Sequence, residues 1–220
     1  MIRPQPGIFT EGTTAHQHLE LRLVDDAPDA AITQALAATR AANALRRTNG
    51  GVGLVIGFGP DLAARLLHDQ VPPLGPFEGY RSPDGAHDAP ATQRDLWIWV
   101  HGPQRDGLVD VIRRVVRAWE GLATIELDID GFVYRDSRDL TGFVDGTANL
   151  PLEDAPAKTL IPSGRPGEGG CCAMSMHFTH DLDGLAALGD HDQARVIGRT
   201  REDDRELPSD EMPNDAHVAR

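Results

Sequence analysis

The chain has 220 residues, of which 40% are hydrophobic and 25% charged, and its formal net charge is −13. This length suffices for one large domain or two modest ones. The acidic balance argues against a nucleic-acid partner, since binding to a polyanion needs clustered Lys and Arg. No apolar run approaches the roughly 20 residues that cross a membrane, and the N-terminus lacks the layout of a secretory signal. We therefore expect a cytoplasmic protein without membrane contact.

The first part of the chain alternates strand and helix patterns. Residues 18–24 alternate apolar and polar side chains, which is typical of a half-buried strand. An alanine-rich run over 29–47 has apolar residues at helical spacing, and the Asn-Gly-Gly turn at 49–51 is typical of its end. Residues 52–58 predict a buried strand, and a shorter helix is expected after Pro60.

A long loop separates these elements from the next set. Residues 71–93 are rich in Pro, Gly and Asp, which predicts a loop. Residues 96–100 predict a third strand, 104–119 an amphipathic helix, and 125–129 a fourth strand with one wet face. The order strand, helix, strand, strand, helix, strand is that of an α+β, ferredoxin-like split βαβ domain.

The second half begins in a similar way. A glycine-containing loop around residue 145 and a Pro/Gly-rich segment over 151–170 come first. Residues 171–179 then predict a strand, and 181–198 predict one or two helices. We therefore expect a second ferredoxin-like half, which is incomplete over the present sequence.

Asp145 is the most informative residue of the chain. It lies between Gly142 and Gly146 in the run LTGFVDGTAN. Glycines allow backbone conformations closed to other residues, and they let the backbone approach a ligand closely. An acid held in such a loop is typical of a functional site, although the same pattern also occurs in a turn whose Asp bonds the backbone.

Three ordered segments carry a resemblance to a known family. The run GFVDGT at 142–147 resembles the Gly-x-x-Asp-Gly loop of the dye-decolourising peroxidases, haem enzymes that reduce hydrogen peroxide. Residues 196–207, followed by 214–218, resemble the segment that leads into the proximal haem ligand. Residues 4–9 are similar to the start of the bacterial, cytoplasmic branch. The resemblance covers almost the whole chain, with the segments in the family's order.

The resemblance implies a fold of two ferredoxin-like halves, the dimeric α+β barrel of the family. The boundary is expected between an N-terminal domain over 1–138 and a partial haem-binding domain over 139–220. Family members often assemble, so a homo-oligomer is expected as well.

The resemblance also assigns roles to single residues. Asp145 would take a proton from hydrogen peroxide and return it to the departing oxygen, and a carboxylate remains a base in acid where an imidazole is already protonated. His217 would ligate the iron of haem b, iron protoporphyrin IX, through a neutral imidazole. The reducing substrate would be a dye or another small aromatic one-electron donor. Further residues expected to line the haem are Gly142, Phe143, Val144, Gly146, Thr147 and Asn149, with Arg199 on the proximal or propionate side.

Two features of the family fall beyond Arg220. They are the distal arginine, which would face the negative charge on the leaving oxygen, and the carboxylate that partners the proximal histidine. One alternative is therefore a truncated or degenerate relative that binds haem poorly and is non-catalytic. Another is that a second chain supplies the segment.

Other patterns leave alternatives open. The glycines at 50–59 run through a predicted strand and do not open a helix after it, so we reject a nucleotide site. The adjacent Cys171 and Cys172 are interpreted as reduced thiols, with a redox pair as the alternative. His16 and His18 would be a chelating pair or surface residues without a ligand. For the following aromatic residues, core packing is the usual role, and relay of electrons to a surface site is the alternative: Trp97, Trp99, Trp119 and Tyr134.

Overall fold

The computed structural model describes residues 3–42, 51–72 and 74–219. The chain divides into two compact units, the first formed by 1–132 with 151–173 and the second by 133–150 with 174–220. Within the described ranges, no helix has the length and apolar character needed to cross a bilayer.

The first unit is built on a four-stranded antiparallel sheet with the order β2-β5-β1-β6. Helices connect its strands in the sequence expected for a split βαβ domain, which confirms the ferredoxin-like prediction. The elements are β1 (Ala15–Leu23), α1 (Asp29–Ala42), β2 (Gly53–Phe58), β5 (Leu96–Gly102), α3 (Arg105–Ala118) and β6 (Ala123–Phe132).

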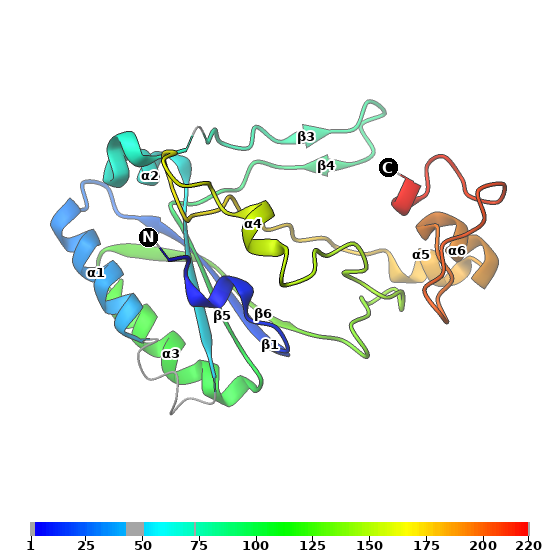
Figure 1. Cartoon of the computed structure of the whole chain (residues 1–220), viewed down its shortest axis with the longest axis horizontal. Coiled ribbons are helices and arrows are strands. Elements are labelled where there is room, and N and C mark those ends of the chain that lie inside the picture. Colours follow the sequence, from blue (N-terminus) through cyan, green and yellow to red (C-terminus); the bar gives the residue numbers. More distant parts are fainter. Residues whose placement is uncertain (1–2, 43–50, 73, 220) are drawn as a thin grey trace. The chain divides into compact units, whose positions relative to one another are not determined.

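Helices α1 and α3 cover one face of this sheet (Figure 1). Alternate strand residues such as Leu19 and Ile98 point to that face and are fully buried, because successive side chains of a strand point to opposite sides. Helix α3 meets them with Leu108, Val111 and Val115, whose spacing places them on one stripe. Full burial of each such side chain contributes about 1.5–3 kcal/mol.

The outer edge of β2 is closed by a side chain from the N-terminal segment. The Gln5 amide donates to the Ile56 carbonyl at 2.8 Å and accepts from the Ile56 amide at 2.9 Å. This pairing satisfies backbone groups that an edge strand otherwise leaves open. Residues 6–9 then form the 3-10 turn η1 (Pro6–Phe9), which packs on β2.

Short elements complete the first unit. The helix expected after Pro60 is confirmed as α2 (Pro60–Leu67), followed by the turn η3 (His68–Gln70). The predicted loop over 71–93 carries a small hairpin of β3 (Tyr80–Arg81) and β4 (Asp88–Ala89) (Figure 1). Helix α4 (Ala155–Thr159) lies in the Pro/Gly-rich segment.

One predicted helix is confirmed over part of its length, and one predicted strand does not form. The helix predicted over 29–47 is confirmed as far as Ala42, and residues 43–50 lie outside the described residues. The strand predicted over 171–179 is wrong, because this segment forms no ladder with any described strand. A strand pattern needs a neighbouring strand to take up its backbone hydrogen bonds.

The second unit consists of loops and short helices. The prediction of one or two helices over 181–198 is confirmed by α5 (Leu182–Ala187) and α6 (Asp190–Ile197). The 3-10 turn η4 (His217–Ala219) contains the candidate iron ligand. Among the described residues of the second unit, strand-like pairing is limited to isolated β-bridges. These join Tyr134 with Arg138, Arg138 with Val144 and Arg199 with Glu206.

Candidate functional site

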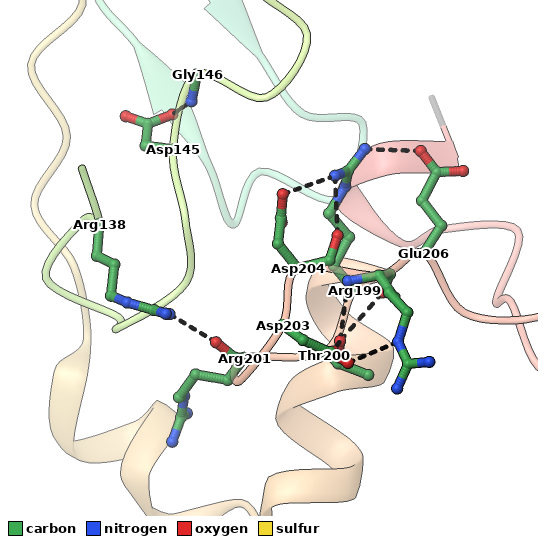
Figure 2. Close-up of polar contacts among 10 residues, drawn as sticks. Arg138, Asp145, Gly146, Arg199, Thr200, Arg201, Asp203, Asp204 and Glu206 are labelled. Atoms are coloured by element: carbon green, nitrogen blue, oxygen red, sulfur yellow. Dashed lines mark hydrogen bonds and ion pairs between the residues drawn. The ribbon is translucent and has the colours of Figure 1, made fainter. Parts of the chain in front are cut away.

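The backbone of the Asp145 loop is held by Arg138. The Arg138 Nη1 donates to the Arg201 carbonyl oxygen at 2.6 Å (Figure 2). It also donates to the Gly142 carbonyl at 2.8 Å, and Arg138 Nη2 donates to the Glu202 carbonyl at 3.4 Å. Arginine presents several donors in one rigid plane. One side chain therefore joins the loop to a segment 63 residues further along the chain.

The loop also folds back on itself through its own backbone. The Asp145 amide donates to the Ser137 carbonyl at 2.8 Å, and the Asp139 amide donates to the Phe143 carbonyl at 3.0 Å. Gly142 has φ +88° and Gly146 φ +74°, left-handed conformations that side chains oppose. These glycines are therefore needed for the turn itself, as the sequence pattern suggested.

The Asp145 carboxylate is exposed. Within the described part of the chain, its one hydrogen bond is accepted from the Gly146 amide at 2.7 Å, and Figure 2 shows it apart from the other labelled side chains. A carboxylate can accept about four hydrogen bonds. Asp145 thus combines a fixed backbone with oxygen atoms that remain available to a small ligand.

Phe143 anchors the loop. Its side chain is 4% exposed, and the guanidinium carbon of Arg201 lies 5.0 Å from the centre of its ring, a cation–π contact. Arg201 also reaches Asp190, at the start of α6, at 3.4 Å. The predicted haem-lining residues of this loop are thereby linked to α6.

His217 lies on η4 with an exposed side chain. The turn is positioned by Gly198, the left-handed C-cap of α6 with φ +93°. A Cβ at Gly198 would stand 2.4 Å from Val218 Cγ2 and 3.2 Å from Ala216 Cβ. Ala216 is 1% exposed, so both neighbours of His217 pack against one glycine.

Arg199 directly follows that glycine and is engaged by two acids. Its Nη1 lies 3.1 Å from Asp204 and its Nη2 2.7 Å from Glu206 (Figure 2). In the next turn, a hydrogen bond from the Thr200 hydroxyl, with the positive charge of Arg205 nearby, holds the pKa of Asp203 below its ordinary value. This acidic turn fixes the segment between α6 and η4.

A surface pocket of about 480 Å³ lies beside the Asp145 loop, within the second unit. Neither Asp145 nor His217 is among its lining residues, so the candidate carboxylate and imidazole lie outside this pocket. Its walls come from Leu140, Thr141, α5 and the first turns of α6, together with Arg201.

The structure brings some predicted site residues into contact and leaves others apart. Gly142 and Phe143 both adjoin Arg201, and the Asn149 amide donates to the Gly146 carbonyl at 3.0 Å. Val144 pairs with Arg138, while Thr147 is exposed. The roles predicted for these residues, and for Arg199 and His217, stay predictions.

Sequence reasoning missed two positioning residues. Gly198 ends the predicted helix over 181–198, and a glycine just past a helical pattern is a known sign of a left-handed cap, so a local signal existed. No local sequence pattern indicated the role of Arg138, because two of its partners, Arg201 and Glu202, lie far along the chain.

Comparison with known proteins matches this arrangement to one family. The model for the N-terminal part of Dyp-type peroxidases matches residues 5–133, and the model for the C-terminal part matches residues 136–220. A dye-decolorizing peroxidase of Mycolicibacterium paratuberculosis is 34% identical over 99% of this chain and 62% of its own length. That of Mycobacterium tuberculosis is 34% identical over 76% of this chain and 50% of its own length. The chain thus spans between half and two thirds of these curated relatives.

Solved structures agree. DyPB from Rhodococcus jostii superposes with a TM-score of 0.81 at 28% identity, covering 100% of this chain and 72% of that chain. A variant of that protein, solved in complex with heme, has a TM-score of 0.81 at 29% identity, covering 98% and 71%. Because the two family models together cover almost the whole sequence in the expected order, this chain belongs to the Dyp-type peroxidase family.

Proposed function

We propose that the chain acts as a haem peroxidase of the dye-decolourising type, reducing hydrogen peroxide and oxidising dyes or other small aromatic one-electron donors. The observation that carries the proposal is the state of Asp145. Its backbone is fixed by Arg138 and Ser137, while its carboxylate is exposed and accepts one short-range hydrogen bond among the described residues. General acid–base catalysis needs this combination of a fixed position and a free oxygen.

The residues of the second unit fit haem b. The exposed imidazole of His217 suits an axial ligand, and η4 holds it through the packing of Ala216 and Val218 on Gly198. The guanidinium of Arg201 is partly exposed, and its ion-pair partner Asp190 lies at 3.4 Å. Its positive charge suits an anionic group such as a porphyrin propionate. When bound, haem would supply the two electrons that reduce hydrogen peroxide.

Asp145 would handle the protons of this reaction. Its carboxylate accepts the proton of one peroxide oxygen and returns it to the other oxygen, which leaves as water when the O–O bond breaks. The same carboxyl group is thereby restored for the next cycle. Proton transfer of this kind contributes about 100- to 10,000-fold in rate.

Replacement of Asp145 by Asn tests this role. The variant keeps the loop's shape and an acceptor oxygen but removes the base, so we expect peroxide-dependent dye oxidation by the haem-loaded chain to fall about 100-fold or more. Asp136→Asn is a matched control, because Asp136 is exposed on the neighbouring turn and Asn tolerates its φ of +52°. Equal turnover in the two variants would remove Asp145 from the reaction.

Two further predictions accompany the proposal. A homo-oligomer is expected from the family resemblance, and light scattering on the purified chain tests it by its mass. Cytoplasmic location is expected from the resemblance of residues 4–9 to the cytoplasmic branch of the family, and cell fractionation tests it.

A further inference from the structure

The sheet face of the first unit that α1 and α3 leave uncovered carries a row of aromatic rings. His16 and His18 come from β1, and Trp97, Trp99 and His101 from β5. The two indole rings are stacked with centroids 6.1 Å apart, and the rings of Trp99 and His101 are 4.2 Å apart. The ring planes of His16 and Trp99, and those of His18 and Trp97, are nearly parallel, with 5.8 Å between the centroids of each pair.

Each of the two indoles donates its hydrogen bond to a histidine. Trp97 Nε1 lies 3.3 Å from His18 Nδ1, and Trp99 Nε1 lies 3.1 Å from His16 Nδ1. The indole N–H is a donor only, so both Nδ1 atoms accept and both imidazoles are neutral in this arrangement. Burial lowers the pKa of His16 and of His18, which favours that neutral form.

Glycines on the flanking strands make room for these rings. A Cβ at Gly53 would come within 2.3 Å of the His101 ring, and one at Gly57 within 3.1 Å of Trp97. On the other side, a Cβ at Gly131 would stand 3.3 Å from His16 Cβ. Part of the glycine-rich run rejected above as a nucleotide site therefore has a structural explanation, namely space for this row.

Trp119 provides an internal contrast. It is 1% exposed in the core, and its Nε1 donates to the Thr39 hydroxyl at 3.0 Å. A hydroxyl is a poor base at neutral pH, whereas a neutral imidazole is a good one. Core packing therefore explains Trp119, but it does not explain why both half-buried indoles on the other face have a histidine as acceptor.

We propose that Trp97 with His18, and Trp99 with His16, form a proton-coupled redox site. A strong one-electron oxidant removes one electron from an indole, and the Nε1 proton moves along the existing hydrogen bond to Nδ1 of its histidine. The products are a neutral tryptophanyl radical and an imidazolium. A one-electron donor, such as an aromatic substrate, returns the electron, and the proton then returns to the indole.

The inference rests on the proposed function only for the physiological oxidant, since a peroxidase that has reacted with peroxide supplies oxidants of this class. The proton acceptor is set by geometry alone. On the strands of this face, the other titratable or charged side chains of β1 and β5 are Glu20, next to His18 along β1, Arg22 and His101. Arg22 pairs with Glu126 of β6 at 2.8 Å.

Photo-oxidation of the purified chain without haem tests the proposal independently of peroxidase activity. A ruthenium tris-bipyridine complex, oxidised by a laser flash and a quencher, serves as the one-electron oxidant at neutral pH. Transient absorption distinguishes the protonated tryptophan radical cation from the neutral radical. We expect the wild type to give the neutral radical directly, with a solvent deuterium isotope effect on its formation.

Three variants separate the alternatives. Trp119→Phe should leave the radical yield unchanged, and Trp97→Phe/Trp99→Phe should reduce it to the background from the buried Trp119. His16→Gln/His18→Gln should give the radical cation first, because an amide oxygen accepts the hydrogen bond but not the proton. An unchanged yield in the Trp97/Trp99 variant, or the same radical form with and without the two histidines, would overturn the proposal. Should the tryptophan variant fail to fold by circular dichroism, the histidine variant and the isotope effect decide alone.

Discussion

The two units of the chain are stabilised in different ways. The first has a layered core of sheet and helices. The second consists of loops and short helices, and ion pairs and backbone hydrogen bonds stabilise it. Among the described residues, the buried apolar side chains of the second unit are Phe143 and Ala216 alone. Phe143 lies two residues from Asp145, and Ala216 is next to His217.

Because of this difference, single contacts determine the positions of the candidate site residues in the second unit. With so little apolar burial, its candidate chemical groups depend on a few individual contacts, those of Arg138, Arg201 and Gly198. In the first unit, by contrast, many buried side chains share the stabilisation, and single positions matter through the volume they fill. Substitutions in the two units should therefore differ in kind as well as size.

The largest effect on stability is expected in the first unit. Ile98→Ala empties a fully buried position on the central strand β5 and should lower the free energy of unfolding by about 3 kcal/mol. All three tryptophans lie in this unit, so their fluorescence during urea unfolding reports on it. Val109→Ala, at an exposed site of α3, is the control and should shift the midpoint little. A similar shift for both would contradict the layered core.

A smaller and more local effect is expected for Gly198→Ala. The left-handed backbone and the clash with Val218 should cost about 2 kcal/mol or more within the second unit. We expect weaker haem binding, measured by titration of the haem absorbance, with the tryptophan-fluorescence midpoint unchanged.

Gly189→Ala is the matched control at the other end of α6. Gly189 has φ −69°, and its Cβ would meet nothing within 4 Å, so haem affinity should stay at the wild-type value. If both variants bind haem equally well, Gly198 does not position His217.

Loss of the Arg138 side chain should loosen the Asp145 loop. Arg138→Gln removes its hydrogen bonds to Gly142 and Arg201, at a cost of about 1.5 kcal/mol. The Asp145 amide, which donates to Ser137, should then exchange its hydrogen faster, as measured by hydrogen–deuterium exchange. Arg135→Gln removes an exposed side chain whose one described contact is the Tyr134 ring, and it should leave this exchange rate unchanged.

The smallest effect is a pH dependence in the first unit. Burial lowers the folded-state pKa of His16 and His18 below the unfolded value of about 6.5. The unfolded chain therefore binds protons more readily, so this contribution to stability is complete above about pH 6.5 and is lost as the pH falls through the folded pKa values. Urea midpoints from pH 8 to pH 5 measure it. The His16→Gln/His18→Gln variant should show a flatter profile, and an identical slope would contradict the assignment.

The sequence predicted the first unit well because its information is local. The alternation in 18–24 and the apolar stripe over 104–119 each fix an element, and the order of elements fixes the sheet. The strand predicted over 171–179 failed for the opposite reason. Its alternation is real, with Met174, Met176 and Phe178 all exposed, but strand formation depends on a partner that no local pattern specifies.

The candidate site was predictable in part. The loop glycines around Asp145 indicated its conformation, and family resemblance indicated His217, but neither indicated what holds these residues. Arg138 and Gly198 act through contacts with distant segments. The hydrogen bonds from Trp97 and Trp99 to histidines likewise depend on strand register. The register places His18 opposite Trp99 and His16 opposite His101, so each indole bonds the histidine diagonal to it on β1. Register cannot be read from a single strand.

Haem titration of the purified chain tests the central claim, that the second unit binds haem through His217. Wild type and His191→Ala, which removes an exposed imidazole on α6, should each bind one haem and give the same Soret band. His217→Ala should lose that band, and added imidazole should restore it. A His217→Ala chain that binds haem with the wild-type spectrum would contradict the account.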